Sequence, residues 1–439
     1  MRVKRLQLEN FRGFRALDLE FADAATTLLV GANASGKTSI LDAIAISLAE
    51  FAGYFYSHNG HPFLQLRIAD LSKGATRVGI ETELEVEAPT GRSSLVLPTR
   101  LEFEPGETRI FYTPTSMTDA TWFRSWQSAL HSDPATPIPA IAVYPTERFL
   151  EVNLPESASP DLPVRTPQIY GETFVRRHDL QHFLRWYRNR EDFENEMIRE
   201  SRDYRDPQID AVRRATAKIL PGISGLRVRR IRHLTRAGDI IAAPGEGPIF
   251  TVRKDGVELR LSQLSHGEQV LFGLAGDLAR RLAITNPGAD DPLRGRGVVL
   301  IDEIELHLHP AWQREVIPRL EQAFPGLHFI VSTHSPQVLA EVRPEQVILL
   351  RDFAVAGRAS PTRGRDANSI LLELMGIDPY PRFGRQQITR VARLIDDERW
   401  EEARSALAEL KESFGASDTE VLRLGALMEF LDSDDGDAA

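Results

Sequence analysis

The alternation of apolar and polar residues along the chain predicts strands and helices in a mixed order. Positions 3–21 alternate around a turn-forming glycine and predict an opening hairpin. A continuous apolar run at 27–30 predicts a buried strand, and apolar residues at 40–49 then repeat at helical spacing. Alternation returns from about 75 to 115, which predicts a small antiparallel sheet.

The second half of the chain continues the mixed pattern. Residues 118–170 are rich in Pro and Ser and have little periodicity, whereas 173–220 have a helical pattern that is interrupted near Pro207. The elements expected after them are strands over 226–261, a helix after Gly267, a buried strand at 298–301, a helix at 311–323, a strand at 328–331 and acidic helices after 366.

Composition narrows the possible chemistry. The chain has 439 residues and no cysteine, which excludes disulfides, cysteine zinc sites and thiol nucleophiles. Its net charge of -10 comes from the segment that begins at Asp396, where 14 acidic and 4 basic residues differ by -10. We find no signal-peptide core and no run that approaches the roughly 18 apolar residues of a membrane span. We therefore expect a cytoplasmic protein with no membrane partner.

A phosphate-binding motif follows the first buried strand. Residues 31–38 fit G-x-x-x-x-G-K-[ST] without a mismatch, between a strand and a helix as this motif requires. We expect backbone amides to surround the phosphates of ATP, Lys37 to reach the β and γ oxygens, and the Thr38 hydroxyl to bind Mg²⁺. The expected nucleotide-binding residues here are Gly31, Ala32, Asn33, Ala34, Ser35, Gly36, Lys37, Thr38 and Ser39.

Three further segments carry candidate chemistry. The strand at 298–301 ends in Asp302 and Glu303, which are expected to hold the Mg²⁺ shell and to orient the attacking water. Ser265 is expected to cap a helix whose exposed amides attract an anion. His334 follows the strand at 328–331, and ligands of open α/β sheets lie at such carboxyl ends.

Together and in this order, the four segments resemble the ABC ATPases. The opening Leu-x-Asn-Phe-Arg-Gly-Phe at 8–14, the signature at 264–269 and Asp-Glu-Ile-Glu-Leu-His-Leu-His-Pro at 302–310 are similar to the branch that contains RecF, SMC and OLD proteins. The resemblance implies an α/β P-loop NTPase head with a mixed sheet flanked by helices, an antiparallel β subdomain, a helical insertion and a helical C-terminal segment. The implied boundaries are 1–117 and 226–350 for the two lobes, 118–225 for the insertion and 351–439 for the C-terminal segment.

The resemblance also implies roles for single residues. Two heads would enclose two ATP molecules, so that Ser265, Gly267 and Glu268 act on the nucleotide of the partner head. Lys37, Glu303 and His334 would be catalytic, and His334 would sense the γ-phosphate. The cofactors that the resemblance implies are ATP and Mg²⁺. Arg12 would contact the nucleotide or the phosphate loop from the side, against the alternative of a plain surface arginine.

A narrower resemblance extends over most of the chain. Residues 179–200, 282–287 and 364–371 look like the ATPases of Septu anti-phage systems, the PtuA family of AAA_15 or AAA_21 type, which also occur with retrons. This resemblance implies an ATP hydrolase that works with itself as a dimer or higher oligomer and with a separate HNH nuclease. The alternative is a RecF-like DNA-repair ATPase that binds DNA without a nuclease. An OLD-type nuclease domain has little room, because 105 residues (439 minus 334) follow His334 and have helical patterns.

Several assignments stay open on the sequence. The Q-loop role falls to Gln127 or to the segment 144–148, and the basic stretch at 225–236 either binds nucleic-acid phosphates or is an exposed strand face. His309 occupies the D-loop position, with metal binding by His307 and His309 as the alternative. A second histidine pair, His178 and His182, is one helical turn apart, as in some metal sites. The surrounding Arg176, Arg177 and Arg185 favour a basic helix face over a metal site.

Overall fold

The computed structural model describes most of the chain, in two compact units that we treat separately, Met1–Ile370 and Leu371–Ala439. The described residues are 1–56, 64–89, 91–103, 110–113, 120–148, 166–174, 180–229, 232–234, 240–242, 249–358, 363–365, 367–373, 378 and 380–434.

A six-stranded sheet forms the centre of the first unit. Its strand order is β16 (Ala354–Arg358), β15 (Val347–Arg351), β3 (Thr26–Gly31), β14 (Leu327–Thr333), β13 (Gly297–Ile301) and β7 (Ala140–Tyr144). All neighbours pair in parallel except β15 and β16. Every residue of β3, β13 and β14 is buried. Burial on both faces explains why these strands have continuous apolar runs instead of alternation.

A second, antiparallel sheet is built from the N-terminal third of the chain. It contains, in spatial order, β2 (Phe14–Glu20), β1 (Arg2–Phe11), β4 (Arg77–Ala88), β5 (Gly91–Phe103) and β6 (Ile110–Thr113). The expected opening hairpin is present, with Phe11 opposite Phe14. Because β1 also pairs with β4, the hairpin and the sheet expected at 75–115 form one sheet.

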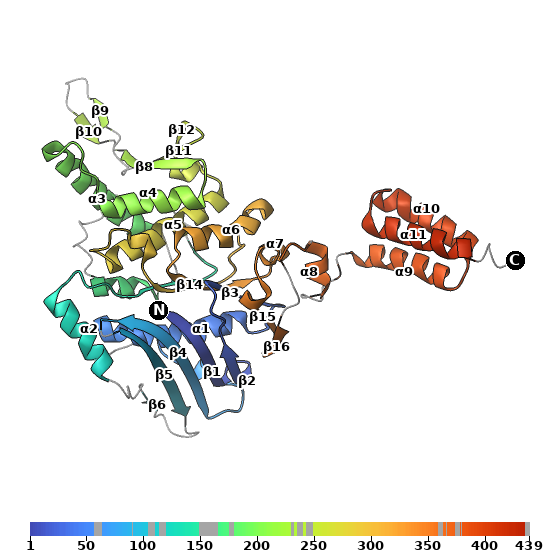
Figure 1. The fold of residues 1–439 in the computed structure, drawn as a ribbon, viewed down its shortest axis with the longest axis horizontal. Helices are drawn as coiled ribbons and strands as arrows, with labels where there is room; N and C mark the ends of the chain where they lie inside the picture. Colours follow the sequence, from blue (N-terminus) through green and yellow to red (C-terminus); the bar gives the residue numbers. More distant parts are fainter. Residues whose placement is uncertain are drawn as a thin grey trace. The chain divides into compact units, whose positions relative to one another are not determined.

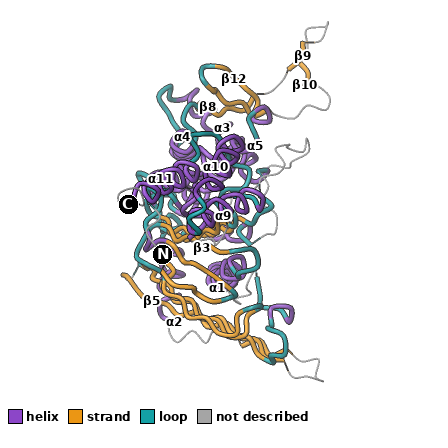
Figure 2. Tube along the Cα trace, turned by 90° about the vertical axis from the view of Figure 1, so that its right-hand side faces the viewer, coloured by secondary structure: helices purple, strands orange, loops and turns teal. Residues whose placement is uncertain are grey.

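Helix α1 (Lys37–Tyr56) packs against strands of both sheets. Figures 1 and 2 show it on the side of the central sheet that faces the antiparallel strands. The span Lys37–Phe55 is long and apolar enough to cross a membrane, which corrects the expectation that no segment approaches that length. However, 72% of its apolar window is buried inside the unit, as in the core helix of a folded domain.

Helices cover the other face of the central sheet (Figures 1 and 2). They are α3 (Gln181–Glu200), α4 (Pro207–Ile219), α5 (His266–Thr285) and α6 (Pro310–Ala323). The expected interruption near Pro207 is present, because α3 ends at Glu200 and α4 begins at Pro207. Asp206 caps α4, and proline tolerates the first helical position. Beyond α4 lies a three-stranded sheet of β12 (Val257–Arg260), β11 (Ile249–Lys254) and β8 (Ile223–Arg229).

Shorter elements complete the first unit. They are η1 (Ile68–Asp70), α2 (Ala120–Ser132), η2 (Thr166–Glu172), β9 (Arg232–Leu234), β10 (Ile240–Ala242), η3 (Leu261–Gln263), η4 (Pro292–Arg294), α7 (Pro336–Leu339) and η5 (Pro344–Gln346). The division between the units, after Ile370, falls inside α8 (Ala367–Glu373). The second unit is a bundle of α9 (Arg382–Asp396), α10 (Trp400–Phe414) and α11 (Thr419–Asp434) around a small apolar core.

Two expected boundaries differ from the structure. The segment 118–225, expected to be a mainly helical insertion, contains β7, whose buried apolar residues complete the edge of the central sheet next to β13. The sheet also continues past residue 350, because β15 ends at Arg351 and β16 pairs with it. The compact units accordingly divide between Ile370 and Leu371 instead of at residue 351.

Candidate nucleotide site

The phosphate loop connects the end of β3 to the start of α1. Gly36 has a φ of +104°, a conformation that glycine adopts without strain. A Cβ atom on Gly31 would lie 2.3 Å from the carbonyl oxygen of Leu350, and one on Gly36 would lie 2.4 Å from the Phe14 ring. Residues 32–34 are exposed. Both glycines are therefore required by close packing, and the loop between them is open to solvent.

Lys37 folds back over this loop. Its ammonium donates hydrogen bonds to the carbonyl oxygens of Gly31 and Ala32, both at 2.9 Å. Burial lowers the pKa of Lys37, and the nearby carboxylates Asp302, Glu303 and Glu305 partly oppose that shift. The only side-chain cation that this loop contributes is thus already held at the place where phosphates are expected.

Three strand ends meet beside Lys37. The Thr38 hydroxyl donates to Asp302 Oδ2 at 3.0 Å, and the Ser332 hydroxyl donates to Asp302 Oδ1. Ser332 Oγ also accepts the backbone N–H of Glu303 at 2.8 Å. A hydroxyl and a carboxylate are hard oxygen ligands, and nucleotide-bound Mg²⁺ needs only one or two protein ligands beside phosphates and water. Thr38 and Asp302 therefore fit this ion.

Glu303 and His334 lie at the same edge. Glu303 has a φ of +49°, so the chain turns sharply where β13 ends. Glu305 Oε1 accepts the backbone N–H of His334, while Glu305 Oε2 is buried with no hydrogen-bond partner among the described residues. Burial, and then the charge of Lys37, lower the pKa of the half-buried His334. The imidazole is thus neutral near pH 7.

Arg148 was not assigned a role of its own on the sequence. It follows β7, is 2% exposed, and donates to the backbone oxygens of Asp302 at 2.5 Å and Glu303 at 2.8 Å. Ser332 is the second residue that the sequence did not single out, although it lies two positions before His334. On the sequence, the only indication of a role for either residue is its position, Arg148 in the segment 144–148 and Ser332 two positions before His334.

The signature segment is built differently. Ser265 caps α5, and Glu268 closes a capping box through Ser265 N and Oγ, at 3.0 and 2.8 Å. Lys254 bonds the other Glu268 oxygen at 2.7 Å. The Ser265 side chain is exposed. The expected cap is thus confirmed.

Gly267 packs against the segment that follows the Mg²⁺ carboxylates. A Cβ atom there would lie 2.6 Å from the carbonyl oxygen of His307. The rings of His266 and His307 stack 4.2 Å apart with an interplanar angle of 13°. The signature therefore contacts the residues after β13 of its own chain.

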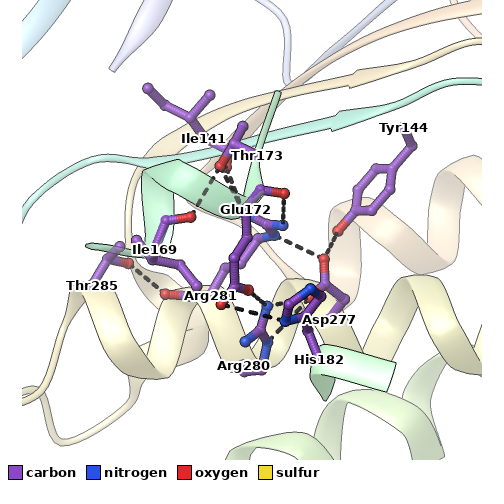
Figure 3. Close-up of polar contacts among 10 residues, drawn as sticks. All are labelled: Ile141, Tyr144, Ile169, Glu172, Thr173, His182, Asp277, Arg280, Arg281 and Thr285. Atoms are coloured by element: carbon purple, nitrogen blue, oxygen red, sulfur yellow. Dashed lines mark hydrogen bonds and ion pairs between the residues drawn. The ribbon is translucent and has the colours of Figure 1, made fainter. Parts of the chain in front are cut away.

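Buried charges connect the signature helix to β7 (Figure 3). Asp277 of α5 accepts hydrogen bonds from the Tyr144 hydroxyl and from Arg281 Nε, both at 2.8 Å. Arg280 bonds Asp277 and Glu172, and Arg281 also bonds Thr173 at 2.8 Å. The backbone oxygen of Tyr144 accepts the N–H of Asp302 at 2.9 Å. The network fixes α5 against β7, which lies beside the edge that carries Thr38, Asp302, Glu303 and Ser332; we call this edge the Mg²⁺ edge.

Arg12 lies beside the start of α1 but already has partners. Its Nε donates to Asp70 at 2.9 Å and its Nη1 to Asp42 at 2.5 Å. These carboxylates, opposed by burial, raise the pKa of Arg12. Together with Arg67 the three residues line a pocket of about 460 Å³. Arg12 is therefore not a plain surface arginine, and its contact with a nucleotide stays a prediction.

Gln127 is too far from the phosphate loop to act as the Q-loop residue. It is exposed on α2, next to Trp126, whose ring packs on Phe51 and Phe55 of α1. Phe51 is 14 residues from Lys37, about 21 Å along a helix at 1.5 Å per residue. The segment 144–148, by contrast, reaches the Mg²⁺ edge through Arg148.

The metal alternatives gain no support. No group of three or more His, Cys, Asp or Glu suited to a metal ion occurs among the described residues. His309 caps α6 by accepting the N–H of Ala311 at 3.3 Å. His178 lies outside the described residues, and His182 Nδ1 is 3.7 Å from Glu172.

The basic stretch at 225–236 lies partly on β8. Arg227 and Arg229 are exposed there, but Arg229 pairs with Glu258 of β12 at 2.8 Å. Arg230 lies outside the described residues. At least one charge of the stretch is therefore neutralised locally.

Comparison with known proteins places the chain in a family. It is 28% identical to the retron Ec83 probable ATPase of Escherichia coli, covering 97% of this chain and 86% of that protein. It is 23% identical to the Septu protein PtuA of Bacillus thuringiensis, covering 90% of each. Among solved structures, an SMC head bound to the C-terminal winged-helix domain of ScpA is 18% identical with a TM-score of 0.44, covering 83% of this chain and 96% of that one.

Residues 26–340 match the family described as AAA domain, putative AbiEii toxin, Type IV TA system. Since that match spans more than half of the sequence, the chain belongs to this family of AAA-type ATPase domains, which confirms the resemblance on which the sequence assignment rests.

Proposed function

We propose that this ATPase binds Mg-ATP at the edge formed by residues 31–38, Asp302, Glu303 and His334, and hydrolyses it within a head-to-head dimer. The observation that supports this most strongly is the chain of contacts from Thr38 through Asp302 and Ser332 to Glu303. It joins the phosphate loop, the Mg²⁺ carboxylate and the candidate base at the carboxyl ends of three parallel strands.

Each residue has a distinct task in this mechanism. A water oxygen bonds to the γ-phosphorus while the bond to the β,γ-bridging oxygen breaks, which yields ADP and phosphate. The Glu303 carboxylate orients that water and takes its proton. His334 is neutral near pH 7 and donates an N–H to a γ-phosphate oxygen, and Lys37 leaves the loop carbonyls to bind the β and γ oxygens. Thr38 and Asp302 would hold Mg²⁺, which would supply charge neutralisation at the phosphates.

The exposed signature supports the dimer part of the proposal. Ser265, Gly267 and Glu268 form the start of a 20-residue helix, whose amides attract an anion. Among the described residues, the polar side-chain contacts of Ser265 are with Glu268. We therefore assign these residues to the γ-phosphate held by a second subunit.

The relatives suggest what hydrolysis controls. Proteins similar to this chain along most of its length are named retron Ec83 probable ATPase and Septu protein PtuA. We propose that this ATPase regulates a partner HNH nuclease in anti-phage defence, inside the cytoplasm. A RecF-like role on DNA without a nuclease is the alternative outcome of the test below.

The test has two parts. Phosphate release is measured for the purified chain with Mg-ATP, and Glu303→Gln is expected to abolish it while ATP still binds. The gene beside that of this chain is then read for an HNH pattern; a protein with that pattern is co-expressed with the chain, and co-purification is expected. Turnover by Glu303→Gln at the wild-type rate contradicts the catalytic assignment. Absence of a complex, together with DNA binding by the chain alone, favours the RecF-like role.

A further inference from the structure

Arg148 occupies an unusual place for a charged side chain. It lies four residues after Tyr144, and Tyr144 is opposite Ile301 in the parallel pair of β7 and β13. Its side chain therefore emerges one strand away from the Mg²⁺ carboxylate. At 2% exposure it is among the largest fully buried side chains of the described residues.

The hydrogen bonds of Arg148 go to backbone, not to carboxylates. Nη1 donates to the carbonyl oxygens of Asp302 at 2.5 Å and Pro145 at 3.1 Å, and Nη2 donates to that of Glu303 at 2.8 Å. A planar guanidinium suits this arrangement, because its donors point in fixed directions toward two successive carbonyls. A lysine ammonium keeps the charge but lacks that fork.

The backbone N–H groups of the same two residues also have partners. The N–H of Asp302 donates to Tyr144 O at 2.9 Å, and the N–H of Glu303 donates to Ser332 Oγ at 2.8 Å. Both peptide groups are thus fixed at the point where Glu303 has a φ of +49°. Such a backbone conformation persists only where the surroundings enforce it.

The positive charge of Arg148 lies among three carboxylates. Burial lowers its pKa to about 10, and the carboxylates of Asp302, Glu305 and Glu303 oppose that shift. A group with a pKa near 10 remains protonated at pH 7. One buried cation therefore offsets part of the repulsion among three carboxylates.

We propose that Arg148 is a positioning residue for ATP hydrolysis. By fixing the backbone of Asp302 and Glu303, it holds the Glu303 carboxylate in the orientation that activates water, without touching the nucleotide. This inference rests on the proposed function, since it needs Glu303 as the base. It also assigns a task to the segment 144–148, which on the sequence competed with Gln127 for the Q-loop role.

The experiment compares full-length Arg148→Ala and Arg148→Lys with wild type for kcat, for ATP affinity by equilibrium titration, and for Tm. We expect Arg148→Ala to lower kcat about 100-fold while the Kd for ATP changes less than about threefold. Millimolar guanidinium is expected to restore part of the lost kcat, which a general loss of stability does not allow. Arg148→Lys is expected to lose about tenfold in kcat. If the alanine variant does not fold, the kcat of the lysine variant tests the positioning role.

Arg213→Lys is the control, because Arg213 also makes a two-pronged contact, with Glu194 of α3 at 2.9 and 3.1 Å. Its kcat is expected to stay within about twofold of wild type. Three results overturn the positioning role: wild-type kcat in the Arg148→Lys variant, an affinity loss as large as the kcat loss, or an equal kcat loss in the control. A wild-type rate for Glu303→Gln refutes the proposed function instead, so the two failures are distinguishable.

Discussion

The Mg²⁺ edge and the signature segment are both polar, but they are built in opposite ways. At the Mg²⁺ edge, Thr38 bonds Asp302 across 264 positions of sequence, and Ser332 bonds Asp302 across 30. In the signature, Ser265 and Glu268 satisfy each other at a separation of three. Asp302 and Ser332 are buried, whereas Ser265 is exposed.

This difference separates two kinds of function. The Mg²⁺ edge requires the whole central sheet and is held by internal bonds, as a catalytic constellation must be. The cap of the signature is a local contact at a helix start, and the Ser265 side chain is exposed to solvent. A pre-organised edge acts on what it holds, and an exposed helix start is suited to a ligand that another subunit holds.

The largest effect is expected from the phosphate loop. Lys37→Ala removes the one loop cation, so the Kd for ATP is expected to rise more than about 100-fold. The exposed Lys218 of α4 provides the control, and Lys218→Ala should bind ATP as wild type does. Equilibrium titration with a fluorescent ATP analogue measures both. An unchanged Kd for ATP in Lys37→Ala would contradict the assignment of the loop to the nucleotide site.

A variant of the signature should lose ATP hydrolysis but keep ATP binding, unlike a variant of the phosphate loop. Ser265→Arg is expected to bind ATP but not hydrolyse it, because the altered helix start faces the partner's nucleotide. An equal mixture with Lys37→Ala should recover part of the wild-type rate, since a mixed dimer carries one intact composite site. Phosphate release from each variant and from the mixture measures this. A mixture as inactive as its components contradicts action in trans.

The Ser332 bridge is expected to matter less than Lys37 but more than an ordinary buried hydroxyl. Ser332→Ala leaves the Asp302 carboxylate and the Glu303 N–H without their shared partner, and kcat should fall about 10-fold to 100-fold. Ser47→Ala is the matched control, since Ser47 is a buried serine of α1 that bonds Thr82 at 2.8 Å. Equal rates in the two variants show that the bridge has no catalytic part.

The smallest effect concerns stability at the other end of β14. His328 is 1% exposed, its Nδ1 accepts the N–H of Val3 at 3.2 Å, and burial lowers its pKa to about 3. The unfolded chain takes up this proton below about pH 6.5 whereas the folded chain resists it, so the contribution to stability is full above that pH. It is lost by up to about 1.4 kcal/mol per pH unit as the pH falls toward 3.

Urea unfolding at pH 7.5 and 5.5 measures this slope. His328→Asn keeps an acceptor for Val3 without a titrating ring and should flatten the slope, while kcat at pH 7.5 stays unchanged. Exposed His131→Asn is the control and should keep the wild-type slope. A wild-type slope in His328→Asn contradicts this assignment.

The same contrast explains what the sequence alone could predict. The phosphate loop, the carboxylates after β13 and the Ser265 cap follow from local patterns, and the strands around them were expected at nearly the observed positions. The family resemblance was confirmed as well. Which strands are neighbours depends on burial across the whole sheet, so the bridge of Ser332 and the bonds of Arg148 could not be read from spacing.

Two other expectations were limited for the same reason. The segment that contains β7 appeared to be part of a helical insertion, because its pairing with β13 spans more than 150 positions. Gln127 was a candidate only by residue type, and the packing of Trp126 places it near the far end of α1. Contacts between distant segments decide both points.

The central claim is that two chains close on ATP, with the Mg²⁺ edge of each completed by the signature of the other. The most direct test is the mass of the Glu303→Gln variant by light scattering with and without Mg-ATP. The account predicts that ATP doubles the mass from that of the 49.2 kDa chain, and that adding Ser265→Arg to the same chain prevents the increase. An unchanged mass in Glu303→Gln while ATP is demonstrably bound contradicts it.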